Sequence, residues 1–131
     1  MQKSQDNIKN ALFEPYQLGD LILPNKFVMA SLTRVRCDPK TGIANDMMAE
    51  YYSARASAGL LITEAAAVSN AANSFPGSPA IYNCEQMEGW KQVVDAVHKK
   101  GGRIFLQMIH GGRAAHPEQT GEQNISSSAV A

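Results

Sequence analysis

Three apolar stretches of strand length recur along the chain, and their spacing constrains the fold more than any other feature. They are KFVMASL at residues 26–32, LLITEAAA at 60–67 and IFLQMI at 104–109. Continuous apolar runs of this length are typical of parallel strands that are covered on both faces. The starts of consecutive runs are separated by at least about 30 residues, enough for the helix of a βαβ unit. The sequence therefore predicts a parallel α/β sheet.

Helical patterns fill both intervals between the apolar runs. Asn45 is placed to cap a helix over residues 45–58, and Gly59 follows as the residue that ends it. The second helix has Asn83 as its N-cap and Gln86 in the position of a capping box. Its spacing predicts a buried stripe made of Met87, Trp90, Val94 and Val97.

The N-terminal part of the chain precedes this pattern. Residues 1–11 are polar, and we expect them to be disordered. Residues 13–18 and 21–23 flank Gly19 and Asp20, which together form the two-residue turn of a short β-hairpin. With 131 residues and 44% hydrophobic side chains, the chain is expected to form a single domain.

Charge and cysteine content exclude several classes of partner. Lys+Arg and Asp+Glu balance at 12 each, so there is no general electrostatic argument for nucleic acid or an anionic membrane. Cys37 and Cys84 form no CxxC pair, and the N-terminus has no apolar targeting segment, so we expect reduced thiols and a cytoplasmic location. His110 and His116 lack the spacing of a zinc helix, and no metal site is expected.

Polar side chains collect where the predicted strands end. Ligand sites of parallel α/β proteins lie at the C-terminal ends of their strands. No GxGxxG or GxxxxGK[ST] motif follows a strand, so no nucleotide phosphate cradle is predicted. Hydroxyl and amide groups suit a flat heteroaromatic ring with a polar edge. The residues concerned are Ser31, Thr33, Thr63, Glu64, Gln107 and His110.

Two of these groups allow alternative interpretations. Gln107 is predicted to be buried among apolar neighbours, where an unpartnered amide would cost about 1 to 3 kcal/mol, so its partner is either protein or a ring with a carbonyl and an N–H. Glu64 is expected to be a structural carboxylate paired with Arg34 or Arg113 rather than a catalytic acid.

Four segments carry a resemblance to a known family. They are LFEPYQLGDLILPNKFVMASLTR, YYSARASAGLLITEAAAVS, FPGSPAIYNCEQMEGWKQVVDAVHKKGGRIFLQMIHGGRAAHP and SSSAVA. In order and spacing they resemble the N-terminal part of the Old Yellow Enzyme family, the FMN-dependent NAD(P)H oxidoreductases or ene-reductases. The resemblance implies the N-terminal part of a (β/α)8 TIM barrel, with about three βα units after the hairpin and the barrel left incomplete.

The resemblance also implies which residues contact FMN. Thr33 would reach the ring and tune its redox potential, Ala65 would contact the cofactor through its backbone, and Gln107 would hold the pyrimidine edge. The residues expected to line the cofactor are Ala30, Ser31, Leu32, Thr33, Ala65 and Gln107.

Three positions depart from the residues that the family commonly has. Phe75 stands where many members have a tyrosine over the substrate pocket, and Ile109 where many have tryptophan. Both are expected to line the substrate pocket, with packing inside its own loop as the alternative for Phe75. Ser31 replaces the commoner proline.

The resemblance implies a function with two alternatives. In the complete enzyme NAD(P)H would reduce FMN, and the flavin would pass hydride to an activated alkene such as an enone. The substrate-anchoring His pair or His-Asn pair, the proton-donating tyrosine and the phosphate loops belong to the second half of the family's barrel, so no catalytic residue is expected here. The first alternative is an inactive half-barrel that associates with a complementary chain or with itself through its open edge. The second is another (β/α)8 enzyme, an aldolase or amidohydrolase, which the lack of a strand-end lysine or HxH pair disfavours.

Overall fold

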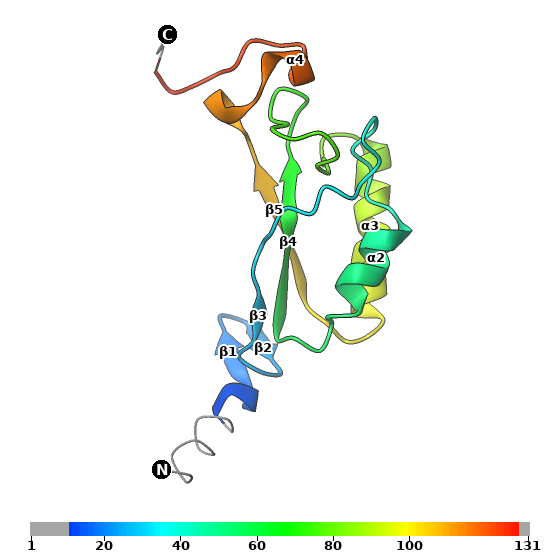
Figure 1. Cartoon of the computed structure of the whole chain (residues 1–131). Coiled ribbons are helices and arrows are strands. Elements are labelled where there is room, and N and C mark those ends of the chain that lie inside the picture. Colours follow the sequence, from blue (N-terminus) through cyan, green and yellow to red (C-terminus); the bar gives the residue numbers. More distant parts are fainter. Residues whose placement is uncertain (1–10, 129–131) are drawn as a thin grey trace, which may run out of the picture.

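The computed structural model describes residues 11–128, which form an open parallel sheet with two main helices on one side (Figure 1). A separate hairpin precedes the sheet, and a short C-terminal segment lies at its opposite end. The elements are β1 (Tyr16–Leu18), β2 (Leu21–Leu23), β3 (Val28–Met29), α2 (Asp46–Ser53), β4 (Leu60–Ala67), α3 (Cys84–His98), β5 (Ile104–Ile109), the 3-10 turn η1 (Gly112–Ala114) and α4 (Pro117–Thr120).

Strand β4 is the centre of the sheet, whose order is β3-β4-β5 with both pairings parallel. The predicted parallel α/β architecture is therefore confirmed. Within residues 11–128 the strands do not close into a barrel. The predicted hairpin is also confirmed, with β1 and β2 antiparallel and Gly19 at a φ of +56° in the turn, where a side chain would be strained.

A bulge interrupts the pairing of β4 with β5. Ile62 pairs with Phe105, but the next aligned pair is Ala65 with Gln107. Two residues of β4, Thr63 and Glu64, therefore lie opposite one residue of β5, Leu106. The extra residue breaks the strict alternation of faces along the strand. Leu61 and Ala66 consequently both belong to the core under the helices, although they are an odd number of positions apart.

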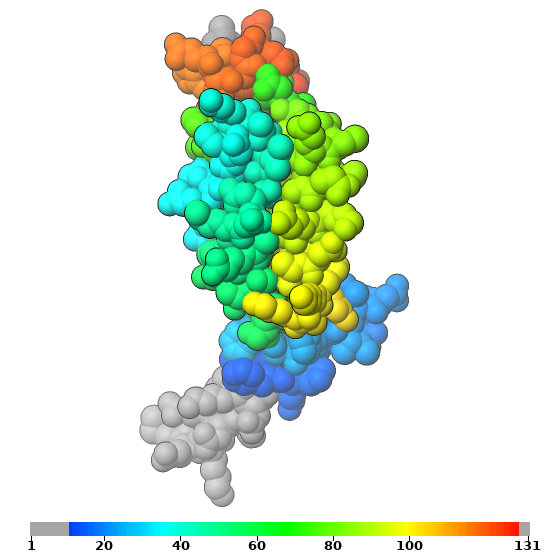
Figure 2. Space-filling view, turned by 90° about the vertical axis from the view of Figure 1, so that its right-hand side faces the viewer, coloured from blue at the N-terminus to red at the C-terminus, as the bar shows by residue number. Residues whose placement is uncertain are grey.

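Helices α2 and α3 lie side by side along the length of the sheet and cover one of its faces (Figure 2). The side chains of Asn45 and Asn83 accept hydrogen bonds from the backbone N–H groups of Met48 and Gln86, as expected for N-caps. Their shared core with the sheet includes Met48, Tyr52, Leu61, Ala66, Trp90, Val93 and Val97.

The predicted end of the first helix is wrong. Helix α2 ends at Ser53 rather than near residue 58, and the chain continues in tighter turns, in which the N–H groups of Arg55 and Ala58 donate to carbonyls three residues earlier. Gly59 does not end the helix. It is required because a Cβ there would lie 2.0 Å from the backbone oxygen of Asn25.

The predicted stripe of α3 is rotated by one position. Trp90 and Val97 are buried as expected, but Met87 is 51% exposed, and Val93 rather than Val94 is fully buried. The reason is that Gln86 faces the interior, where its Nε2 donates to the Thr41 carbonyl at 2.9 Å.

The expectation that all strands are covered on both faces is wrong for the two outer strands. Only Val28–Met29 of the run 26–32 is strand, and Val28 is 50% exposed. In β5 the side chains of Phe105 and Met108 are exposed, and so is Gln107. The apolar pattern indicates that both faces of a strand can be buried. Within residues 11–128, however, only the face of the sheet under α2 and α3 is covered.

The chain termini add little to this frame. We expected residues 1–11 to be disordered. Residues 1–10 lie outside the described part of the chain, and residue 11 is helical. Residue 13 is helical too, so the first hairpin strand is shorter than predicted. None of the helices between residues 11 and 128 has the length and apolar character needed to span a membrane.

Candidate functional site

Four residues that the sequence assigned to a cofactor or substrate line one small pocket beside the C-terminal ends of the strands. Thr33 follows β3, Ala65 lies in β4, Phe75 lies in the loop after β4, and Ile109 ends β5. The pocket volume of about 30 Å³ holds little more than water, so it is not by itself a cavity for a ring. The other lining residues are Ala67, Ala72, Asn73, Ser74 and Ser78.

Gln107 lies beside this pocket, and its amide is held at one end only. The Ser31 hydroxyl donates to Gln107 Oε1. No hydrogen bond from Gln107 Nε2 to any residue between 11 and 128 is present, and the side chain is exposed rather than buried. The prediction of a buried amide is therefore wrong. Two amide N–H groups remain free to donate to a ligand.

The bulge in β4 fixes the position of Gln107. The Thr63 hydroxyl accepts a hydrogen bond from the Gln107 backbone N–H at 3.1 Å and donates to the Glu64 carbonyl at 2.8 Å. Thr63 is 1% exposed, so these bonds form away from water. A side chain thus supplies the hydrogen bond that the interrupted ladder would otherwise provide.

Glu64 is a structural carboxylate, as the sequence predicted, but its expected partners are wrong. Its Oε2 accepts from the backbone N–H groups of Arg34 at 2.9 Å and Val35 at 3.2 Å, and its Oε1 accepts from the Tyr52 hydroxyl at 3.4 Å. The Arg34 guanidinium instead lies over the Tyr51 ring, 4.9 Å from its centroid. The sequence does not predict these partners, because backbone N–H donors are present at every non-proline residue and leave no pattern of basic side chains.

These bonds shape the loop that carries Thr33. Val35 has a φ of +50°, which is strained for a β-branched residue. That conformation turns its N–H toward the same carboxylate oxygen that the Arg34 N–H reaches. The buried Glu64 therefore holds the loop after β3 against the sheet.

Cys37 belongs to the same interior. Its Sγ donates to the Gly77 carbonyl at 3.0 Å. Burial raises the pKa of the Cys37 thiol to about 12, and the nearby Glu64 and Asp38 carboxylates contribute to the rise. Burial likewise raises the pKa of the Tyr52 hydroxyl above its ordinary value. Both groups remain protonated at neutral pH, so neither is a candidate base.

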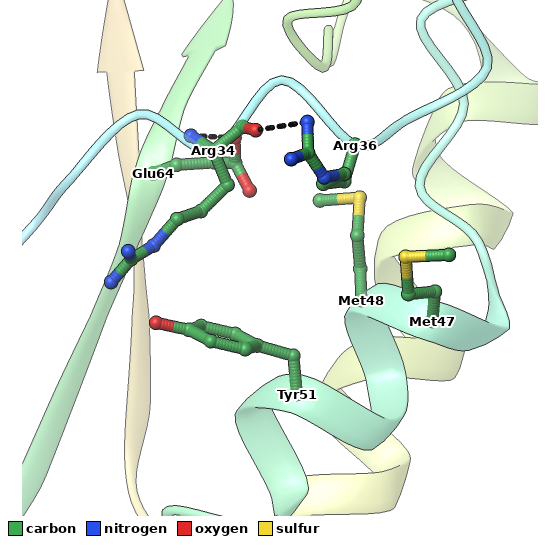
Figure 3. Close-up of a pocket in the computed structure, with 6 residues that line it drawn as sticks. All are labelled: Arg34, Arg36, Met47, Met48, Tyr51 and Glu64. Atoms are coloured by element: carbon green, nitrogen blue, oxygen red, sulfur yellow. Dashed lines mark hydrogen bonds between the residues drawn. The ribbon is translucent and has the colours of Figure 1, made fainter.

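A second pocket lies on the other side of this loop, between it and α2 (Figure 3). Its volume is about 210 Å³. The Arg36 guanidinium crosses its upper edge and donates to the Arg34 carbonyl at 3.3 Å, while Arg34 Nε is buried without a hydrogen-bond partner. The sequence did not predict this pocket. It is lined by Arg34, Arg36, Met47, Met48, Tyr51 and Glu64.

The polar side chains at the strand ends include free hydrogen-bond donors, which the carbonyl oxygens of a flavin ring could accept from. Gln107 offers free amide N–H groups, and the exposed Thr33 hydroxyl has no hydrogen-bond partner in the described part of the chain. Ala30 and Leu32 are exposed, and Ser31 is half-buried. Residues 11–128 contain no cluster of three or more His, Cys, Asp or Glu side chains that could hold a metal ion.

An open parallel α/β sheet with free amide and hydroxyl donors at its strand ends places this protein in the class of α/β proteins that bind ligands at the C-terminal ends of their strands. Comparison with known proteins narrows the class. Residues 11–131 match the sequence profile of the NADH:flavin oxidoreductase / NADH oxidase family, and the chain belongs to this family. The resemblance found in the sequence is confirmed.

Individual relatives agree. The chain is 48% identical over 106 residues to 12-oxophytodienoate reductase 7 of Oryza sativa subsp. japonica, a match that covers 80% of this chain and 26% of the reductase. The structure of the old yellow enzyme homologue from Zymomonas mobilis superposes with a TM-score of 0.88 at 39% identity, covering 92% of this chain and 34% of that one. Morphinone reductase in complex with tetrahydroNAD gives a TM-score of 0.87 at 46% identity, covering 92% and 33%.

These matches define how far the likeness extends. The chain spans about a quarter to a third of the length of the relatives it matches. The family uses FMN as its cofactor and NAD(P)H as its reductant. The roles of individual side chains toward that cofactor remain predictions.

Proposed function

We propose that this chain forms the first βα units of a (β/α)8 barrel and supplies the residues that hold the ring of FMN in an NAD(P)H-dependent oxidoreductase. The observation that carries the proposal is the free Nε2 of Gln107, fixed by Ser31 and Thr63 at the strand ends beside the pocket that Thr33 lines. Bound FMN would supply hydride transfer from NAD(P)H to an activated alkene, a substrate class supported by the names of the oxophytodienoate and morphinone reductases.

Each residue has a role that its chemistry allows. Gln107 donates to a carbonyl of the pyrimidine edge and accepts from the adjacent ring N–H. The Thr33 hydroxyl donates to a second carbonyl, which stabilises the more negative reduced ring and so tunes its potential. Ala65 presents its backbone to the ring, and its small side chain leaves the surface open. The remaining contacts are Ala30, Ser31 and Leu32 to the cofactor and Phe75 and Ile109 to the substrate.

FMN titration of the purified chain tests this proposal. We expect bound flavin absorbance and quenched flavin fluorescence. Gln107→Ala should weaken binding by roughly tenfold because it removes donors to the ring. Ser57→Ala, an exposed hydroxyl deletion at the opposite end of the sheet, should change nothing. Absence of both signals in the unmodified chain would refute FMN binding by this chain.

A second candidate function is association without turnover. The side chains of Val28, Phe105 and Met108 are exposed on the outer strands, and Met108 is 68% exposed. Unpaired parallel edges with apolar side chains favour pairing with another chain, either a complementary half-barrel or a second copy. Size-exclusion chromatography with light scattering, together with an NAD(P)H-oxidation assay, separates the candidates. A monomer with enone-dependent turnover would contradict this second one.

The cellular location is also a proposal. Cys37 and Cys84 are both free thiols, one buried and one exposed. An exposed thiol without a partner suits a reducing compartment, which supports a cytoplasmic location. Fractionation of cells that express the protein is the direct test.

A further inference from the structure

We infer that the Ser31 hydroxyl is a positioning group that holds the Gln107 side-chain amide in place for the cofactor. The inference rests on the proposed function, because it concerns how this chain presents Gln107 to FMN. A glutamine side chain has several rotatable bonds, so an amide without a hydrogen bond takes many positions, and fixing one of them on binding costs conformational entropy. The structure contains one side-chain hydrogen bond that limits this freedom, from Ser31 to Gln107.

That bond joins two outer strands across the middle one. Ser31 follows β3 and Gln107 lies in β5, 76 residues further along the chain, with β4 between them. Neighbouring strands lie about 4.8 Å apart, so the two side chains must span about 10 Å over β4. Ala65 is the β4 residue in register with Gln107, and paired residues of parallel strands point to the same face. Its single methyl group leaves room for them to meet.

The bond leaves a defined pattern for a ligand. Ser31 donates to Gln107 Oε1, which occupies one of the two lone pairs of that oxygen. The backbone N–H of Gln107 is already bound by Thr63, so the residue is held at both its main chain and its amide oxygen. The amide is therefore held at one place, where it offers two N–H donors and one remaining lone pair. Without the hydroxyl, the amide loses its hydrogen bond to residues 11–128 and rotates freely.

The contact is testable without cofactor. In nitrogen-15 NMR spectra of the apo chain, the Gln107 side-chain amide is assigned by its loss in Gln107→Leu. Ser31→Ala should shift this amide pair and speed its exchange with water, Ser31→Thr should restore the original signals, and Ser57→Ala should leave them unchanged. If Ser31→Ala leaves the Gln107 amide pair unmoved, the inference is wrong.

The consequence is testable with FMN. Ser31→Ala should weaken FMN binding roughly three- to tenfold and make the flavin midpoint potential more negative, because the donor to the ring carbonyl is no longer fixed. Ser31→Thr should recover both values. Weaker binding with an unchanged potential would indicate a merely structural effect and overturn the inference. If the unmodified chain binds no FMN, the proposed function fails, while the apo spectra still decide the role of Ser31.

Discussion

Glu64 and Gln107 lie near the same end of the sheet, but on opposite sides of it. Glu64 points beneath the helices, is 1% exposed, and finds donors in two backbone N–H groups and the Tyr52 hydroxyl. Gln107 lies on the open side, is exposed, and uses only one end of its amide. The covered side supplies the partners of Glu64 from within the chain, and the open side leaves the amide donors of Gln107 free for a ligand. A polar residue's role follows from which partners the fold provides, not from its position at a strand end.

The largest expected effect tests the covered side. Glu64→Ala should destabilise the chain by about 3 kcal/mol, because it removes the acceptor of two part-buried backbone N–H groups and of the buried Tyr52 O–H, which keeps only the Glu64 backbone N–H as a partner. Urea unfolding followed by the fluorescence of Trp90, the only tryptophan, measures this loss. Glu64→Gln keeps an acceptor and should cost less, and the exposed Glu88→Ala is the control. If Glu64→Ala lowers the free energy of unfolding no more than Glu88→Ala does, the hydrogen bonds of the covered side do not stabilise the fold.

The next effect tests how the helices cover the sheet. Val93→Ala should cost about 2 kcal/mol, because Val93 is fully buried and its truncation leaves a cavity. Val94→Ala is matched in chemistry but half-buried and should cost less than half as much. The same urea titration compares the two variants. Equal losses in the free energy of unfolding would support the buried stripe predicted from the sequence and contradict the observed orientation of α3.

Thiol reactivity distinguishes the covered side chemically. With a pKa of about 12, Cys37 has a thiolate fraction of about 1 in 10,000 at pH 8, so it should resist an aromatic disulfide reagent that labels the exposed Cys84. Because the thiol ionises near 9.0 when unfolded and near 12 when folded, the unfolded chain loses its proton first as pH rises. Stability contributed by Cys37 should therefore be intact below pH 9 and decline from there toward pH 12.

The Cys37 prediction has two controls. Cys37→Ala should remove this part of the pH dependence, as measured by urea titrations across the window. Labelling of both cysteines at equal rates under native conditions would show that the covered side opens readily.

The smallest expected effect on stability falls on the open side. Met108→Lys should change the free energy of unfolding by no more than about 0.5 kcal/mol, because the side chain contacts little within the described residues. The same variant should reduce any self-association seen by light scattering, since a charge then occupies an exposed strand. A loss above about 1.5 kcal/mol would mean that this face is packed in solution.

The sequence predicted the elements whose signals are local. The limits of β4 agree with the apolar run at 60–67, and α3 begins after Asn83, whose side chain caps it as expected. The two outer strands were overestimated, because an apolar pattern cannot tell which face another segment covers. The bulge was not predicted, since it depends on a hydrogen bond between Thr63 and the backbone of Gln107 far along the chain.

The predictions for the candidate site divide in the same way, between what the sequence indicates and what depends on contacts between distant segments. Family resemblance selected Thr33, Ala65, Phe75 and Ile109, and the structure brings all four to one pocket. The Ser31 contact could not be found by pattern, because it joins strands that are not neighbours in the sheet. The exposure of Gln107 likewise depends on the whole fold. Their assigned roles toward FMN and substrate stay predictions until flavin binding is measured.

The extra residue in β4 sets the phase of everything beyond it. Before the bulge Leu61 faces the helices, and after it Ala66 does, while Ala65 turns toward Gln107. Deleting one residue at position 63 or 64 would do more than shorten a strand. It would remove the bulge, and strict alternation would then keep Ala66 under the helices and Ala65 beside Gln107, but β4 would have one buried polar residue where it now has two. The extra residue therefore lets one strand carry both the hydroxyl that binds the Gln107 backbone and the carboxylate that holds the loop after β3, and we expect its deletion to release one of these two contacts.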